Sequence, residues 1–259
     1  MTTRIVAIVV GVLLLFAPRV QAQAHAQDVY VMTSGAFTAA FLEAAPAFER
    51  TARTRVSTSF GASMGGAPDS IPSRLGRGEP ADVVILAREA LDDLVAKGRV
   101  VPGSQVDLVR STIGMAVRAG APKPDISSVE ALTRTLLAAK SIAYSASASG
   151  VYLSTELFPR LGVADAIKDK SRRIESERVG TVVARGDAEI GFQQVSELLP
   201  IPGLDYVGPL PEAVQRVTIF SAGIATNAKN VEAAKALIRY LASGAVAPTI
   251  RKTGLEPIQ

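Results

Sequence analysis

Short strand-like runs alternate with stretches of helical spacing along almost the whole chain. The run at 83–86 contains only apolar residues, which is typical of a strand buried in a parallel sheet. Strands are predicted at 28–32, 55–60, 83–86, 109–117, 141–144, 189–193, 206–207 and 217–224. Apolar residues recur every three or four positions in the predicted helices, which lie at 37–48, 70–75, 128–140, 151–161, 179–184 and 231–241.

This alternation predicts an α/β protein with largely parallel sheets. The sequence has no internal repeat and no low-complexity tract. It also lacks a Gly-, Ser- or Pro-rich linker between its two halves. If the protein has two lobes, the chain therefore has to cross between them more than once, and we expect it to cross on strands near 108–118 and 207–224.

The amino end has the features of a secretory signal peptide. Arg4 supplies the positive end, and 5–16 is a run of twelve residues without a charge. Pro18 and Arg19 end this run short of the roughly 20 apolar residues that a transmembrane helix needs. Small residues then occupy the positions of a cleavage site. We predict that residues 1–22 are removed near Ala22, and that the exported chain is soluble without a stable membrane anchor.

The composition excludes several kinds of chemistry. The chain has no cysteine, which rules out disulfides, thiolate metal sites and a cysteine nucleophile. Its single histidine, His25, lies near the amino end, so a histidine base or a multi-histidine metal site is not expected. The net charge of +4 falls to about +2 without the two arginines of the leader, too little to predict nucleic-acid binding. We therefore predict no metal, no cofactor and no nucleic-acid partner.

Small residues and hydroxyl groups gather where predicted strands lead into predicted helices. The first N–H groups of a helix have no partner within the helix, so such turns can bind an anion. Each turn taken alone is better explained as an ordinary helix cap. Ligands of open α/β sheets bind at the carboxyl ends of the strands, so the turns together predict a cleft for a small carboxylate or oxyanion. The residues concerned are Ser34, Gly35, Ser63, Met64, Ser147, Ser149, Gly150 and Val179.

These segments resemble a known family, the periplasmic molybdate-binding proteins of ABC transporters. The resemblance covers nearly the whole mature chain and rests on 34–35, 60–64, 80–87, 149–152, 183–192 and 254–257. It implies a two-lobe type 2 periplasmic binding protein fold, with a mainly parallel sheet flanked by helices in each lobe and a ligand cleft between them. The first lobe would comprise 28–110 with 216–259, and the second would comprise 111–215.

The same resemblance implies ligand-binding roles for particular residues. Ser34 and Ser63 match two hydroxyl donors of the first lobe, and Val179 matches a backbone donor of the second. The turn at 147–150 falls near another backbone donor. Gln194 departs from the pattern, because the molybdate binders usually have a tyrosine there. The implied function is to clamp a small anion for uptake through an inner-membrane ABC permease.

Three further segments resemble a subgroup of this superfamily that includes the periplasmic aconitate isomerase. They are 67–75, 144–153 and 191–197. This resemblance implies interconversion of cis- and trans-aconitate by an allylic proton shift. A tricarboxylate needs positive charge, for which arginine is well suited. The candidates are Arg74, Arg77, Arg118 and Arg178, of which Arg118 and Arg178 are favoured.

An isomerase also needs a base, and the sequence leaves its identity open. Histidine is not available, so the remaining candidates are Tyr144, Tyr152, Glu177 and Asp69, or another carboxylate whose pKa is raised by burial. Binding protein and isomerase both remain possible functions at this stage.

Overall fold

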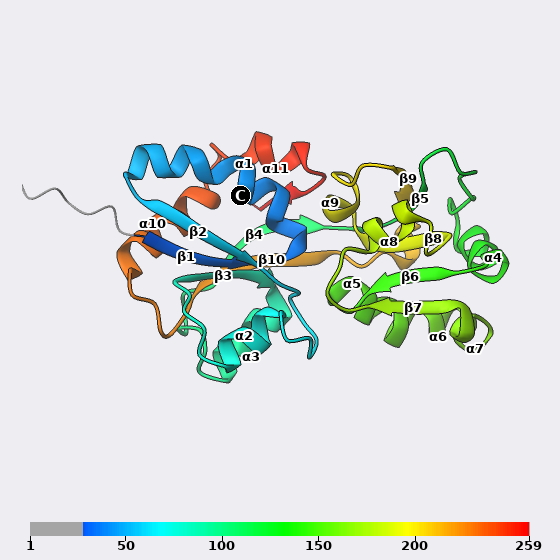
Figure 1. Cartoon of the computed structure of the whole chain (residues 1–259), viewed down its shortest axis with the longest axis horizontal. Helices are drawn as coiled ribbons and strands as arrows, with labels where there is room; N and C mark the ends of the chain where they lie inside the picture. Colours follow the sequence, from blue (N-terminus) through cyan, green and yellow to red (C-terminus); the bar gives the residue numbers. More distant parts are fainter. Residues whose placement is uncertain (1–27, 259) are drawn as a thin grey trace, which may run out of the picture.

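The computed structural model describes residues 28–258, and the predicted signal peptide at 1–22 lies outside them. The strands form two sheets that lie side by side along the long axis of the molecule (Figure 1). The six-stranded sheet has the order β11-β4-β10-β3-β1-β2. Its strands are β1 (Asp28–Thr33), β2 (Arg55–Phe60), β3 (Val83–Ala87), β4 (Val106–Ser111), β10 (Thr218–Ile224) and β11 (Glu256–Pro257).

Helices cover both faces of this sheet, and together they form what we call the first lobe. They are α1 (Gly35–Ala52), α2 (Ile71–Gly76), α3 (Arg88–Ala96), α10 (Val231–Leu241) and α11 (Ala247–Lys252). One face packs against α1, α10 and α11, and the other packs against α2 and α3 (Figure 1). Burial on both faces explains why every residue of β3 is buried.

The second lobe is built on a five-stranded sheet of order β7-β6-β8-β5-β9. Its strands are β5 (Ile113–Arg118), β6 (Ile142–Ser145), β7 (Ser171–Ile174), β8 (Ile190–Gln194) and β9 (Leu204–Pro209). Its helical segments are α4 (Val129–Ala138), α5 (Ala148–Tyr152), the π-helix Leu153–Leu157, α6 (Phe158–Arg160), α7 (Ala164–Ile167), the 3-10 turns Lys168–Lys170 and Glu212–Val214, α8 (Val179–Arg185) and α9 (Val195–Leu198).

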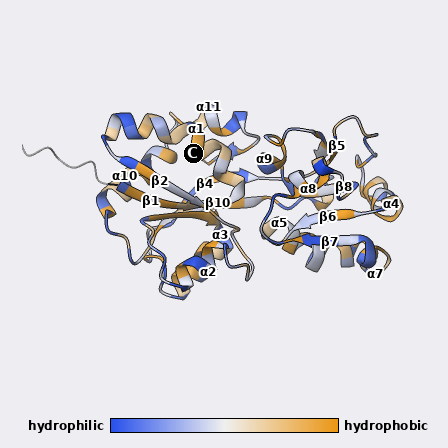
Figure 2. Cartoon of the chain, in the orientation of Figure 1, coloured by the Kyte–Doolittle hydropathy of each residue, from blue (hydrophilic) through white to orange (hydrophobic). Residues whose placement is uncertain are grey.

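Each lobe has its own hydrophobic core on either side of its sheet. Figure 2 shows apolar colouring on the central strands and mixed colouring on the helices, which turn one face to solvent. The edge strand β7 is an exception that the hydrophobic pattern missed. Its Arg172 and Arg173 are exposed, so the segment lacks the apolar run by which the other strands were predicted.

The chain crosses between the sheets twice, as expected for strands near 108–118 and 207–224. The first crossing leads from β4 directly into β5, and the second leads from β9 into β10. Both sheets are mixed, which corrects the prediction of mainly parallel sheets. β1, β2 and β3 pair in parallel, as do β6, β7 and β8, whereas β10 is antiparallel to β3 and β4, and β5 is antiparallel to β8 and β9. The antiparallel pairings belong to the strands that adjoin the crossings.

Candidate functional site

A cavity of about 170 Å³ lies between the lobes and is lined by both of them. Its walls are the loops that follow β1, β2, β6 and β7, together with the end of β8. Pockets for drug-sized ligands measure roughly 300–1,000 Å³, so this cavity suits a small ligand. The parallel strands of each lobe bring their carboxyl ends to the cavity, which is where open α/β sheets bind ligands.

The first lobe contributes two buried serines. Ser34 precedes α1, and its Oγ has no hydrogen-bond partner among the described residues. Ser63 lies in the loop after β2, and its Oγ accepts a hydrogen bond from the backbone N–H of Ala87 at 3.0 Å. The hydroxyl proton of Ser63 is therefore available to a ligand. Gly35 lines the cavity beside Ser34, at the first turn of an eighteen-residue helix.

The second lobe contributes the serines around the start of α5. Ser147 is the N-cap of this helix, but its side chain does not cap it. Ser149 lies within the first turn rather than in the preceding loop, and its Oγ is 3.1 Å from that of Ser145. Gly150 sits behind them, where any Cβ would overlap the backbone of Ser145. The glycine thus lets the helix start close to the end of β6.

Hydrogen bonds join the two lobes around the cavity. The backbone N–H of Ser63 donates to Ser147 Oγ at 3.2 Å, and Ser176 Oγ donates to Asp69 Oδ1 at 3.0 Å. Deeper in the interface, Ser196 Oγ donates to the carbonyl of Ala36 at 2.8 Å. These bonds connect residues of opposite lobes, so the structure represents a closed arrangement.

Gln193 and Gln194, at the end of β8, form a polar floor. Both side chains are buried and line the cavity. Gln194 Nε2 donates to Thr218 Oγ1 at 3.2 Å, while the Oε1 atoms of both glutamines have no partner among the described residues. Buried amide oxygens normally have a partner. A protonated or hydroxylated group of a ligand would satisfy them.

Among the described residues that line the cavity, Arg178 is the one basic side chain, beside the acidic residues Asp69, Glu175, Glu177 and Glu197. Arg178 is half-buried, directly before α8, and no acidic side chain within residues 28–258 forms an ion pair with it. Neighbouring Glu177 is exposed and bonded to Arg185 at 3.1 Å. A positive charge without an acidic partner, beside two serine hydroxyls, favours binding of a carboxylate.

Glu197, in α9, is a cavity residue that the sequence analysis did not single out. Gln193 Nε2 donates to its Oε1 at 2.9 Å. Part of its side chain reaches the cavity, but protein surrounds the carboxyl group, and this desolvation raises its pKa to about 7 in spite of Arg178 and Gln193. The signal that could have revealed it is its place just after β8, at the same edge as the serine loops.

Arg118 does not lie at the cavity, contrary to the sequence-based prediction. β5 runs antiparallel to β8, with Ile113 opposite Gln194 and Val117 opposite Ile190. The amino end of β5 is therefore near the cavity, and Arg118 is at the far end of the strand, beside Gly186. β5 starts near the cleft and runs away from it, so its last residue lies far from the ligand cavity.

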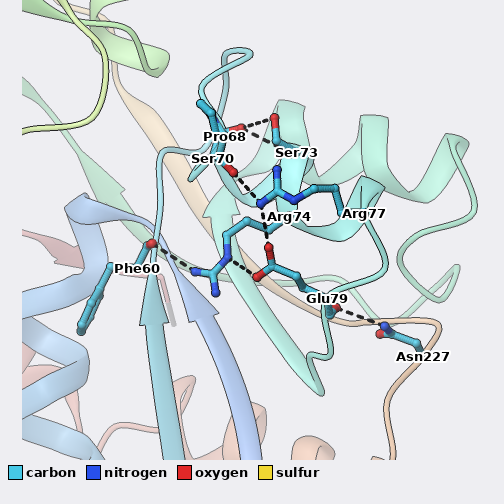
Figure 3. Close-up of polar contacts among 8 residues, drawn as sticks. All are labelled: Phe60, Pro68, Ser70, Ser73, Arg74, Arg77, Glu79 and Asn227. Carbon is cyan, nitrogen blue, oxygen red and sulfur yellow. Dashed lines mark hydrogen bonds and ion pairs between the residues drawn. The ribbon is translucent and has the colours of Figure 1, made fainter.

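Arg74 and Arg77 are likewise absent from the cavity wall. Figure 3 shows both guanidinium groups turned to Glu79, at 2.7 Å from Arg74 and 2.6 Å from Arg77. The bonds from these arginines hold the pKa of Glu79 below its usual range. Arg74 also donates to the carbonyl of Phe60 at 3.3 Å, so the group fastens α2 to the end of β2.

The remaining predicted residues do not line the cavity between the lobes. Val179 is buried at the start of α8 and packs in the second-lobe core. Met64 lines a separate cavity of about 200 Å³ near the crossings. Tyr152 lines that cavity too, and its hydroxyl donates to the carbonyl of Val214 at 2.7 Å. Tyr144 packs edge-on against Phe158. Neither tyrosine lines the cavity between the lobes.

Across residues 28–258, no group of three or more His, Cys, Asp or Glu side chains is arranged to hold a metal ion. In the same part of the chain, no helix combines the length and the apolar character required to cross a membrane.

The chain resembles known proteins over nearly its full length. It is 46% identical over 258 residues to the aconitate isomerase of Pseudomonas sp, which covers all of this chain and 98% of the relative. It is 27% identical over 242 residues to the molybdate-binding protein ModA of Azotobacter vinelandii, covering 89% of this chain and 90% of the relative. The solved structure of the Azotobacter vinelandii periplasmic molybdate-binding protein has the same fold, with a TM-score of 0.70, 20% identity and coverage of 89% and 100% of the two chains.

The family profile described as bacterial extracellular solute-binding protein matches residues 29–256. This match spans both sheets and all the loops that line the cavity. The chain therefore belongs to the bacterial extracellular solute-binding protein family.

Proposed function

We propose that this protein is an aconitate isomerase that binds cis- or trans-aconitate in the cavity between its lobes. The observation that carries the proposal is Arg178, half-buried without an acidic partner among residues 28–258, in the same cavity as the unpartnered hydroxyl of Ser34. The full-length similarity to the aconitate isomerase of Pseudomonas sp supports the choice of substrate.

The cavity offers each part of a tricarboxylate a suitable partner. Arg178 would pair with one carboxylate, because a guanidinium binds carboxylates with two parallel hydrogen bonds. The hydroxyls of Ser34 and Ser63 and the first N–H groups of α1 would hold a second carboxylate. Gln194 stands where the molybdate binders usually have a tyrosine, and the different geometry and reach of its amide count against molybdate as the ligand.

The test is turnover by the purified chain. Incubation with cis-aconitate is expected to yield trans-aconitate, separated and quantified by chromatography, until an equilibrium mixture is reached from either isomer. Arg178→Gln should abolish most of the activity, and Arg118→Gln, which changes an arginine outside the cavity, should retain it. Failure of the wild-type chain to convert either isomer would refute the isomerase proposal.

A second candidate is a transport function, which the family membership favours. In that case the protein is exported to the periplasm, its signal peptide is removed near Ala22, and an inner-membrane ABC permease receives the anion. Ligands that bind the native state raise apparent stability by mass action. A thermal shift with aconitate, molybdate or sulfate in the absence of any turnover would favour transport over isomerisation.

A further inference from the structure

Glu197 lies at the boundary between the two lobes. It belongs to α9 of the second lobe, and its carboxyl group lies against Gly35 of the first lobe. A Cβ at position 35 would overlap that carboxyl group, so a larger residue there would displace the Glu197 side chain. Glu197 also lines the cavity, at the start of α1 beside Ser34, where a substrate carboxylate is expected.

The surroundings of Glu197 keep it able to exchange a proton. β8 supplies the hydrogen bond from Gln193, the loop before α8 supplies the positive charge of Arg178, and α1 presents Gly35 without a charge. The other acidic residues of the cavity, Asp69, Glu175 and Glu177, are exposed. Desolvation outweighs the nearby positive charge, so burial raises the pKa of Glu197 to about 7. A group with a pKa near the working pH can both take and return a proton.

The other candidates for a base are committed elsewhere. Glu177 is bonded to Arg185, and Asp69 accepts a hydrogen bond from Ser176. The hydroxyl of Tyr152 donates to Val214 and lies outside the cavity between the lobes. Among the carboxylates that line the cavity, Glu197 is the one enclosed by protein. Within residues 28–258, no lysine or arginine forms an ion pair with it.

We propose that Glu197 is the catalytic residue that moves the proton, an assignment that rests on the isomerase function proposed above. Its carboxylate removes a proton from the methylene carbon of cis-aconitate, and the C–H electron pair enters the allylic system. The double bond shifts by one carbon, and the protonated Glu197 returns the proton to the carbon that was vinylic. One C–H bond breaks and one forms, so the step needs no oxidant and leaves Glu197 ionised again. Arg178 stabilises the negative charge that the intermediate spreads onto a carboxylate.

The test combines turnover with binding in one variant. Glu197→Gln should lower kcat by about 100-fold or more, the usual contribution of a positioned acid–base group. It should still bind trans-aconitate, measured by calorimetry, because the amide fills the same space. Glu43→Gln is the matched control: this carboxylate is exposed, lies outside the cavity and is paired with Lys252 at 2.9 Å, so its loss should leave kcat unchanged.

Two further readouts separate proton transfer from a merely structural role. Wild-type protein should exchange the methylene protons of aconitate with deuterium from D₂O, and Glu197→Gln should not. The wild-type kcat/KM should rise with pH to a plateau above an apparent pKa near 7, and Glu197→Asp should keep some activity with a shifted profile. Undiminished turnover in Glu197→Gln would overturn this assignment and leave the isomerase function standing. Absence of turnover in the wild type would overturn both.

Discussion

The backbone N–H of Ser63 donates a hydrogen bond to Ser147 Oγ at 3.2 Å, across the boundary between the lobes. The two serines lie in loops that line the cavity from opposite sides. Closure of the cavity therefore brings together two serine-containing loops that lie far apart in the sequence. A ligand that bridges the loops would stabilise this closed arrangement, because it binds only when both are present.

The bond between Ser63 and Ser147 predicts the effect of Ser147→Ala. Loss of a neutral hydrogen bond changes the free energy by about 0.5–1.5 kcal/mol, so the affinity for trans-aconitate should fall by roughly two- to tenfold. Calorimetric titration measures this change. Ser176→Ala removes an exposed bond between the lobes and should have the smaller effect. A larger loss in Ser176→Ala than in Ser147→Ala would show that the buried loops do not control closure.

The two serines of the first lobe should differ when each is replaced by alanine. Ser34 Oγ has no partner among the described residues, so Ser34→Ala should weaken ligand binding with little change in the unfolding free energy. Ser63→Ala leaves the N–H of Ala87 without an acceptor, which costs about 1–3 kcal/mol of stability in addition to affinity. Urea denaturation without ligand separates the two effects.

Ser111 provides the control for this comparison. Its Oγ is also buried without a partner among residues 28–258, but it lies outside the cavity. Ser111→Ala should change neither affinity nor turnover. If it weakens binding as much as Ser34→Ala does, the unpartnered hydroxyl of Ser34 has no special relation to the ligand.

Arg178 and Arg118 make a second matched pair. Hydrogen bonds to charged groups contribute about 1.5–3 kcal/mol, so Arg178→Gln should weaken trans-aconitate binding by at least tenfold. Arg118→Gln should not, since this residue lies at the far end of β5. Dissociation constants measured at one salt concentration test both variants together. Equal losses would indicate a long-range effect of net charge rather than a contact in the cavity.

The burial of Glu197 predicts a dependence of stability on pH. Its pKa rises from 4.5 to about 7 on folding, so between these values the native state holds a proton that the unfolded chain releases. This contribution to stability is fully present below the unfolded-state pKa of 4.5, and it is lost as the pH rises through the folded-state pKa of about 7. Glu197→Gln should remove this contribution.

The measurement is the Tm of the ligand-free protein from about pH 5 to about pH 8. The fall in Tm over this interval should be smaller in Glu197→Gln than in the wild type, and Glu43→Gln, which changes a carboxylate outside the cavity, should follow the wild type. Identical curves of Tm against pH for all three proteins would mean that Glu197 in the folded state is already ionised at the acidic end of this interval, so that burial does not raise its pKa.

The sequence predicted those parts of the structure that depend on local pattern. The predicted helix at 231–241 matches α10, and the predicted helix at 179–184 lies within α8, which ends at Gly186 in the left-handed conformation. Ser128 caps α4 through a hydrogen bond from the backbone N–H of Ala131. In each case a few neighbouring residues determine the outcome.

The failures involve residues whose surroundings come from distant parts of the chain. The position of Arg118 depends on the direction in which β5 pairs with β8, and spacing along the chain carries no information on that direction. Glu197 has a raised pKa because Gly35, Gln193 and Arg178 converge on it from separate elements. Without the fold, it is one glutamate on a short helix.

Calorimetric titration of the wild-type chain with trans-aconitate, beside Arg178→Gln and Arg118→Gln, tests the account most directly. We expect one ligand per chain in the wild type and in Arg118→Gln, and affinity at least tenfold weaker in Arg178→Gln. Absence of binding to the wild type, or binding that Arg178→Gln leaves intact, would contradict the claim that the cavity between the lobes holds a tricarboxylate.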